Sequence, residues 1–253
     1  MLIDVHAHWG PWFFSMEVGP IEVNLELMDR FGIDLQLVSS IEGIVYDAPA
    51  GNRALAGQLP ADDRLRGMLV VDPRRLDEAR ADLQELVAGN DGDTARTTAA
   101  GNGRWVGAKI HTEYSRTPIT TPAMQAAIEL TTEFGLPTLV HTWGDTVLDL
   151  ADLAARVPGS RLIAGHMGAA AWRQVPEAAR RANNLWFEPC WSAPDAGRIR
   201  WILDRIGPDR LMFGTDATLI DPSVALGALT AADLTPAEAD AIRWQNAQSL
   251  FAL

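Results

Sequence analysis

A chain of 253 residues, 47% of them hydrophobic, is long enough to bury a large core in one domain. Its net charge of −12 at pH 7 argues against nucleic acid or an anionic membrane as a main partner. No apolar run approaches the roughly 18 residues that a membrane-spanning helix needs. No signal-peptide pattern precedes the first strand, and the single cysteine, Cys190, allows no disulfide within the chain. We therefore expect a cytoplasmic protein acting on a small molecule, with its oligomeric state, including a homo-oligomer, left open.

Strand-like and helix-like segments alternate along the chain. Strands are expected at an opening run that ends at 4–8, then at 33–39, 67–71, 105–111, 137–141, 162–166, 185–190 and 210–214. Helices are expected at 20–31, between 49 and 60, after Pro73, at 122–135, 145–157, 170–182 and 194–206, and from Thr235, where Thr235 and Glu238 form a capping-box pattern. Residues 89–104 have no period and predict a surface loop. Eight strand–helix units within a single domain over 1–253 predict an α/β fold, a (β/α)8 TIM barrel with its site at the C-terminal ends of the strands.

Every histidine stands at or near the end of a predicted strand. His6 and His8 are one residue apart, so both side chains project from the same face and can reach one ion. Such a pair alone is weak evidence, because it also occurs on ordinary half-buried strands. The other three histidines, His111, His141 and His166, each end a further apolar run. This repeated placement predicts a metal site.

Lys109 is the one lysine among 21 basic residues. Lysine and arginine serve equally well on most exposed faces, so the retained lysine indicates a role that arginine cannot fill. Lys109 lies two residues before His111, on the same face of the predicted strand.

Aromatic side chains follow several of the predicted strand ends. They predict either an aromatic-walled substrate pocket or the packing of loops onto the barrel rim. The residues concerned are Trp9, Trp12, Trp143 and Trp191. His111 is either a substrate contact or a structural histidine. Cys190 is expected to be a small buried residue, since no separate base is assigned to it.

Taken together, these residues resemble the amidohydrolase superfamily, most closely its amidohydrolase-related branch. The pattern is His-x-His on strand one, lysine on strand four, histidine on strands five and six, and aspartate after strand eight. The matching stretches are 5–8, 107–111, 165–168, 213–216 and 246–251. The resemblance covers the whole chain.

The resemblance implies a divalent metal, with zinc the expected ion, held by His6, His8, His141 and Asp216. Asp216 would accept a proton from metal-bound water and return it to the leaving group. His166 would polarise the substrate or bind a second metal. Lys109 would either remain an ammonium that holds an anionic substrate group, or be carbamylated and bridge two metals. The site would accordingly hold one metal or two.

Three functions are compatible with this resemblance. The first is a metal-dependent hydrolase of a C–N or C–O bond in an amide, lactone or ester. The alternative is a lyase, a nonoxidative decarboxylase or hydratase of an aromatic or dienoic acid, in which Lys109 or Arg116 would hold the carboxylate. The third, a noncatalytic ligand-binding barrel, fits least, because the whole ligand set is present.

Overall fold

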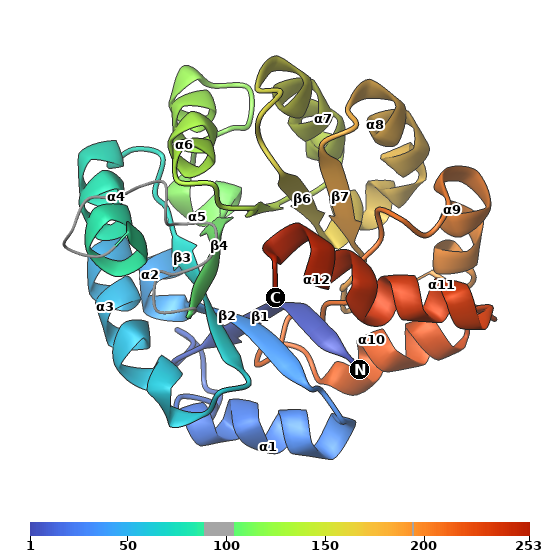
Figure 1. Cartoon of the computed structure of the whole chain (residues 1–253), viewed down its shortest axis with the longest axis horizontal. Coiled ribbons are helices and arrows are strands. Elements are labelled where there is room, and N and C mark those ends of the chain that lie inside the picture. Colours follow the sequence, from blue (N-terminus) through green and yellow to red (C-terminus); the bar gives the residue numbers. More distant parts are fainter. Residues whose placement is uncertain (89–103, 194) are drawn as a thin grey trace.

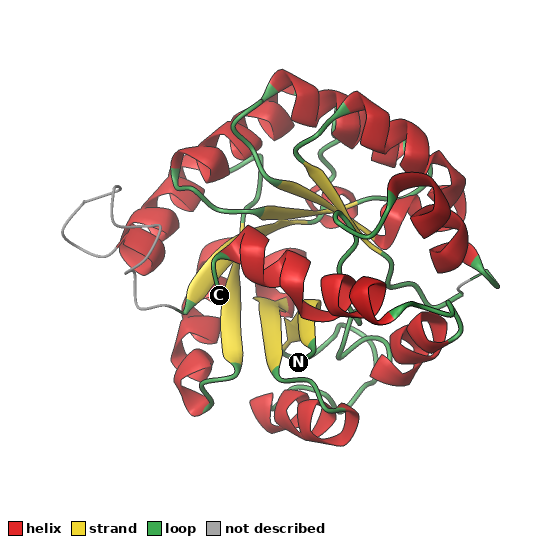
Figure 2. Cartoon of the chain, turned by 45° about the vertical axis from the view of Figure 1, so that its right-hand side comes forward, coloured by secondary structure: helices red, strands yellow, loops and turns green. Residues whose placement is uncertain are grey.

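The computed structural model describes residues 1–88, 104–193 and 195–253. Within them, seven parallel strands form one curled sheet in chain order, and helices surround it (Figures 1 and 2). The strands are β1 Ile3–Trp9, β2 Leu35–Ser40, β3 Leu65–Val70, β4 Trp105–Ile110, β5 Thr138–His141, β6 Leu162–Gly165 and β7 Leu185–Glu188. The predicted loop at 89–104 lies, apart from Arg104, outside the described residues.

The helices follow the strands closely. They are α1 Ile21–Phe31, α2 Ile41–Val45, α3 Ala48–Gln58, α4 Leu76–Asp82, α5 Thr112–Ser115, α6 Pro122–Glu133, α7 Thr146–Arg156, α8 Val175–Arg181, α9 Arg198–Ile206, α10 Pro222–Thr230, α11 Pro236–Asp240 and α12 Asn246–Phe251. The capping box predicted at Thr235 and Glu238 is present at the start of α11. None of the described helices has the length and apolar character required to cross a bilayer.

Three predicted elements are shorter than expected, and one of them, the helix predicted at 194–206, begins at Arg198. The strand predicted at 185–190 ends at Glu188, and the next residue, Pro189, has no N–H to donate to a neighbouring strand. The helix predicted at 170–182 begins only at Val175. Before it, residues His166–Gln174 form 3-10 turns, and their backbone is non-helical at Met167, Gly168 and Ala169.

The α/β fold is confirmed, but a full eight-stranded barrel is not. The predicted eighth strand, 210–214, is not a regular strand, although it lies between β7 and β1. On one side Met212 N donates to Phe187 O at 3.0 Å, and on the other Val5 N donates to Phe213 O at 3.0 Å. The φ angle of Asp216 is 60°, so the chain leaves the extended conformation soon after these contacts.

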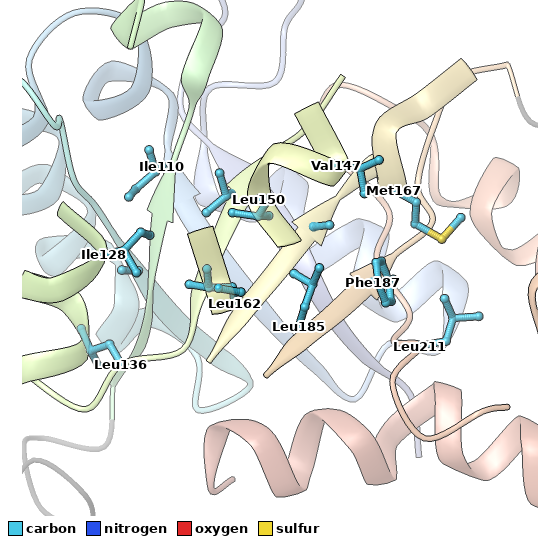
Figure 3. Close-up of a cluster of buried hydrophobic side chains, with 14 of the residues drawn as sticks. Ile110, Ile128, Leu136, Val147, Leu150, Leu162, Met167, Leu185, Phe187 and Leu211 are labelled. Carbon is cyan, nitrogen blue, oxygen red and sulfur yellow. The ribbon is translucent and has the colours of Figure 1, made fainter. Parts of the chain in front are cut away.

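Alternate residues of the strands face two hydrophobic clusters. Leu162 and Ala164 of β6 belong to the cluster between the sheet and the helices. Leu185 and Phe187 of β7 and Leu150 of α7 belong to the same cluster (Figure 3). Ile163 of β6 faces the inner cluster instead, with Ile3, Val5, Leu37, Met68, Leu139 and Met212.

Helix α12 closes the amino-terminal end of the sheet. Leu250 and Phe251 of α12 belong to the inner cluster, and Arg161, just before β6, donates to Leu250 O at 2.7 Å. The interior at this end is therefore filled by apolar side chains. The carboxyl ends of the strands are left to carry the polar residues.

Candidate metal centre

A cavity of about 670 Å³ lies at the carboxyl ends of the strands. Its lining brings together all five histidines and nearly all the other residues predicted for the site. These are His6, His8, His111, His141, His166, Lys109, Asp216, Trp12, Trp143 and Trp191, joined by Tyr114, Leu219 and Ile220. The predicted convergence of strand-end side chains is therefore present in the structure.

Trp9 and Arg116 are not among the described residues that line the cavity. Trp9 packs against the main hydrophobic cluster, because neighbouring residues on β1 point to opposite faces and His8 faces the cavity. Arg116 is exposed and lies after α5. Of its two predicted roles, Trp9 is thus left with packing, and Arg116 does not reach the cavity in which it was predicted to hold a carboxylate.

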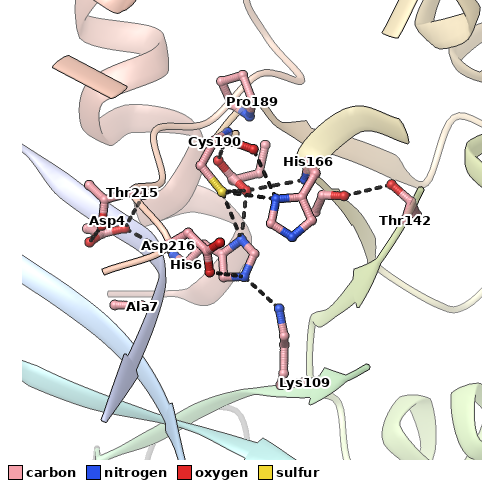
Figure 4. A network of polar contacts seen from close by, with 12 residues as sticks. Asp4, His6, Ala7, Lys109, Thr142, His166, Pro189, Cys190, Thr215 and Asp216 are labelled. Carbon is pink, nitrogen blue, oxygen red and sulfur yellow. Dashed lines mark hydrogen bonds and ion pairs between the residues drawn. The ribbon is translucent and has the colours of Figure 1, made fainter. Parts of the chain in front are cut away.

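Three side chains form a compact group of metal-ligand type. His6 Nε2 lies 3.6 Å from Asp216 Oδ1 (Figure 4). His8 Nε2 lies 2.9 Å from the same oxygen. One donor atom from each residue lies within 4.8 Å of the others, and all three residues are buried. Two imidazoles and a carboxylate that converge in this way are a donor set suited to a divalent metal.

Two of the histidine rings are held through Nδ1. His8 Nδ1 lies 2.9 Å from Ser39 Oγ. The Ser39 hydroxyl donates to Ala7 O at 3.3 Å, so its oxygen is available to accept from His8. His166 Nδ1 donates to the carbonyl of Cys190 at 2.9 Å. In both rings Nε2 is the nitrogen left for the cavity, an arrangement typical of metal-binding histidines.

The electrostatics of the cavity favour neutral imidazoles and an ionised carboxylate. Burial lowers the pKa of His6, His8 and His141. Burial acts to raise the pKa of Asp216, but its contact with His8 and the neighbouring histidines outweigh this effect and hold that pKa well below its usual range. Neutral imidazole and carboxylate are the protonation states that bind metals.

Lys109 is completely buried at the end of β4. Its Nζ lies 2.6 Å from His6 Nε2. Burial lowers the pKa of Lys109 to about 8, and the charge of Asp216 opposes this shift only in part. The side chain is thus an ammonium near neutral pH that becomes a neutral, nucleophilic amine under mildly alkaline conditions.

His111 and His141 form a stack beside the compact group. Their ring centroids are 3.9 Å apart with an interplanar angle of 16°, and Trp143 lies parallel to His141 at 5.9 Å. His141 Nδ1 is buried and has no hydrogen-bond partner among the described residues. His141 lies outside the His6–His8–Asp216 group, so its role as a metal ligand stays a prediction.

The backbone is strained at two candidate site residues. His166 has φ 65° and Asp216 has φ 60°, a conformation that costs a non-glycine residue about 1–3 kcal/mol. Asp4 braces the second of these turns, because its carboxylate accepts from Thr215 N at 3.0 Å, Thr215 Oγ1 at 2.6 Å and His6 N at 3.1 Å. Strain that a polar network maintains in this way is typical of functional sites.

The sequence patterns do not predict Asp4 and Glu188 as residues of the site. Both are fully buried carboxyls, and Glu188 forms a second group of ligand-type atoms with His6, His166 and Cys190. An acidic residue inside or at the end of an apolar run was the available signal. Cys190 is buried as expected, but it also contacts both histidines, with its Sγ 3.3 Å from each Nδ1.

The fold and the site together define a class, α/β proteins with a metal-type centre at the carboxyl ends of a parallel sheet. The family model of the amidohydrolases, Amidohydro_2, matches residues 3–253, so the chain belongs to this metal-dependent family of enzymes. No curated protein matches the sequence significantly.

Solved structures show the same fold at low sequence identity. A 5-carboxyvanillate decarboxylase from Sphingomonas paucimobilis is 15% identical, with a TM-score of 0.71 over 100% of this chain and 99% of that one. A 2,6-dihydroxybenzoate decarboxylase from Rhizobium is 17% identical, with a TM-score of 0.74 over 99% and 98%. A dihydroxybenzoic acid decarboxylase from Polaromonas sp. JS666, solved with manganese and 2-nitroresorcinol, is 17% identical, with a TM-score of 0.74 over 100% and 97%.

Proposed function

We propose that the protein is a metal-dependent nonoxidative decarboxylase of an aromatic carboxylic acid. The observation that carries this proposal is the position of Lys109. It is the only lysine or arginine among the described residues that line the cavity, and it lies beside the metal-type group. A cation deep in a cavity with aromatic walls suits a substrate that has a carboxylate on a ring. That similar folds belong to decarboxylases of aromatic acids supports the same choice.

The residues present fit a divalent metal. We assign His6, His8 and Asp216 as ligands, since their donor atoms converge and burial favours the metal-binding protonation states. His141, on the same cavity wall, is proposed as a further ligand. Both zinc and manganese accept imidazole and carboxylate. We propose one ion per chain, because Lys109 as an ammonium cannot bridge two. When bound, the ion would polarise a substrate oxygen.

The protein side chains would divide the remaining work. Trp12, Trp143 and Trp191 would hold the substrate ring, and the Lys109 ammonium would pair with a substrate anion. Asp216, which is ionised, would accept the proton of a substrate ring hydroxyl and deliver it to the ring carbon that carries the carboxylate, with His166 orienting the substrate. The C–C bond then breaks, its electron pair restores the aromatic ring, and carbon dioxide leaves. We also propose that segment 210–217 takes the place of the eighth barrel strand and so positions Asp216 in the cavity.

A second candidate is the hydrolysis of an amide, lactone or ester. The observation that favours it is the lowered pKa of Lys109, about 8, because a neutral amine reacts with carbon dioxide to form a carbamate. A carbamylated Lys109 would be an anion able to bridge two metals. Asp216 would then accept a proton from the attacking water.

Product analysis with metal-loaded protein separates the two candidates. We would incubate the protein with a panel of hydroxybenzoates and, separately, of lactones, esters and amides, and measure metal content by elemental analysis. Decarboxylation with about one metal per chain and no response to bicarbonate supports the proposal. Hydrolysis that bicarbonate stimulates, with about two metals per chain, would replace it. Lys109→Met, which removes the charge at similar length, should abolish turnover in either case, and Arg116→Met should leave it unchanged.

A further inference from the structure

The turn Glu188-Pro189-Cys190, directly after β7, contacts two of the cavity histidines from behind. Glu188 Oε2 lies 2.8 Å from His6 Nδ1, and the Cys190 carbonyl accepts from His166 Nδ1 at 2.9 Å. Glu188 is fully buried. It does not line the cavity, so the proposed reaction gives it no direct part. Because burying a carboxylate is costly, its contact with the His6 ring indicates a role other than direct catalysis.

The contacts of His6 determine which ring nitrogen carries the proton. Lys109 Nζ lies 2.6 Å from Nε2, and an ammonium only donates hydrogen bonds, so Nε2 must accept. A neutral imidazole has one N–H, which therefore belongs to Nδ1. That nitrogen faces Glu188, which is an acceptor. The two contacts, on opposite sides of the ring, thus require the same tautomer.

Burial raises the pKa of Glu188, but both of its oxygens accept hydrogen bonds that oppose this shift. Its Oε1 accepts from the backbone N–H of Cys190, and its Oε2 accepts from the Cys190 thiol at 2.9 Å. Gly214 leaves the room that the Glu188 side chain occupies. A Cβ added at Gly214 would lie 2.6 Å from Glu188 Oε1, so only glycine leaves this space. On the other side, Arg198 donates to the carbonyl of Pro189 and holds the turn.

We propose that Glu188 is a positioning residue that fixes His6 in its Nδ1–H tautomer and thereby presents the Nε2 lone pair to the metal. This inference rests on the proposed metal site and adds a role for a residue outside the cavity. The same turn sets His166 through a backbone carbonyl, which no side-chain substitution removes. His166 therefore serves as an internal reference for His6 in the same protein.

The variant Glu188→Gln tests the inference sharply because it is nearly isosteric. If the Gln oxygen keeps the backbone N–H of Cys190, the amide NH2 takes the place of Oε2 and faces His6 Nδ1 as a donor. In the Lys109→Met background, where no ammonium donates to Nε2, Nδ1 must then accept, and the proton moves to Nε2. The expected result, relative to Lys109→Met alone, is a reversed tautomer at His6, an unchanged tautomer at His166, and zinc affinity weakened by about 10- to 100-fold.

The tautomers can be read from long-range ¹H–¹⁵N correlation spectra of the metal-free, ¹⁵N-labelled protein at neutral pH, in which only five histidines contribute. Zinc affinity is measured separately by competition with a chromophoric chelator. Asp82→Asn is the matched control. Asp82 is also buried and accepts from Asn52 at 2.9 Å, but it does not line the cavity. This control should lower the stability and leave the His6 tautomer and the zinc affinity unchanged.

The wild-type spectrum alone can overturn the inference. A His6 proton on Nε2 in the wild-type protein contradicts it, whether or not Glu188→Gln folds. An unchanged His6 tautomer in a folded Lys109→Met/Glu188→Gln variant contradicts it as well. Because the spectra need neither metal nor substrate, a failure here is distinguishable from a failure of the decarboxylase proposal, which would appear in product analysis.

Discussion

Most of the buried polar side chains of the candidate site lie at the carboxyl ends of the strands. His6, His8, Lys109 and Asp216 are each at most 6% exposed. Burying such groups is costly unless they are hydrogen-bonded or bind an ion. Their mutual contacts therefore indicate that function, and not stability, accounts for their presence.

Asp216→Asn tests the proposed proton transfer. Asparagine keeps the size of the side chain but neither ligates as an anion nor carries a proton, so we expect kcat to fall by about 10²- to 10⁴-fold. Steady-state kinetics with a substrate identified from the panel provide the measurement. Asp221→Asn is the control, because Asp221 caps α10 and asparagine caps a helix equally well. Wild-type kcat in Asp216→Asn would remove the residue from the mechanism.

Asp4 predicts a pH dependence of stability. Burial raises its pKa from 3.8 to about 7, and hydrogen bonds from Thr215 and Gln36 offset this only in part. Between these two pH values the folded protein keeps a proton that the unfolded chain has released. The contribution of Asp4 to the free energy of unfolding therefore falls as pH rises through this window. Urea denaturation at several pH values should show this fall, and Asp4→Asn should flatten it. An equally steep fall in the variant would assign it to another group.

At the scale of elements, the chain positions the site through short irregular segments that follow regular strands. Segment 210–217 carries Asp216 between β7 and β1, and the turns at 166–174 carry His166. Neither segment repeats the regular geometry of its neighbours. The regular strands and helices thus form the scaffold, and the irregular segments between them orient Asp216 and His166 toward the cavity.

The helix cap at Thr235 gives a prediction about element stability. Thr235 Oγ1 accepts from Glu238 N at 3.3 Å, and the Glu238 carboxylate accepts from Thr235 N at 2.9 Å. Thr235→Ala removes one half of this capping box and should lower the free energy of unfolding by about 1 kcal/mol. Chemical denaturation measures the change. Thr230→Ala, within the last turn of α10, should change stability by less, and an equal loss there would argue against a specific cap.

The loop after β5 supplies an aromatic wall. Trp143 is 45% exposed, stacks on His141 and meets Trp191 edge to face at 6.1 Å. Trp143→Ala should raise KM for an aromatic substrate more than it lowers kcat, because it removes a binding contact that the ground state also makes. Tyr46→Ala, at an exposed tyrosine outside the cavity lining, is the control. An unchanged KM in the Trp143 variant would leave this tryptophan with a packing role only.

At the scale of the whole molecule, the two ends of the sheet differ in what fills them. Helix α12 and apolar side chains close the amino-terminal end, and the carboxyl end opens into the polar cavity. A metal bound there would join β1 to the segment that carries Asp216. Metal binding should for this reason stabilise the closed arrangement of the chain against unfolding.

This coupling can be measured by thermal unfolding. A metal that binds only the folded protein adds about 2.7 kcal/mol to stability at a free concentration 100 times Kd. We expect Tm to rise with zinc or manganese and to fall again when a chelator is added. His8→Ala should abolish the rise, and His111→Ala should retain most of it. A rise of equal size in His8→Ala would place the metal elsewhere.

The positions of most strands and helices could be predicted from the sequence, because the spacing of apolar residues indicates which residues are buried. β1 to β7 lie at or within a few residues of the predicted strands. The convergence of the histidines with Lys109 and Asp216 followed from the rule that parallel strands end at one edge. Of the two roles predicted for Trp9, its place beside the main hydrophobic cluster favours packing, since alternation along β1 turns it away from the cavity.

What the sequence determined by itself is the set of elements, the direction of the strands and the residues at their ends. These depend on local period and on the order of the chain. Only the tertiary structure decided that Glu188 faces His6, 182 positions away in sequence, and that 210–217 joins β7 to β1 without becoming a regular strand. Contacts of this kind depend on packing between distant segments, and no local pattern encodes which side chain a buried carboxylate will meet.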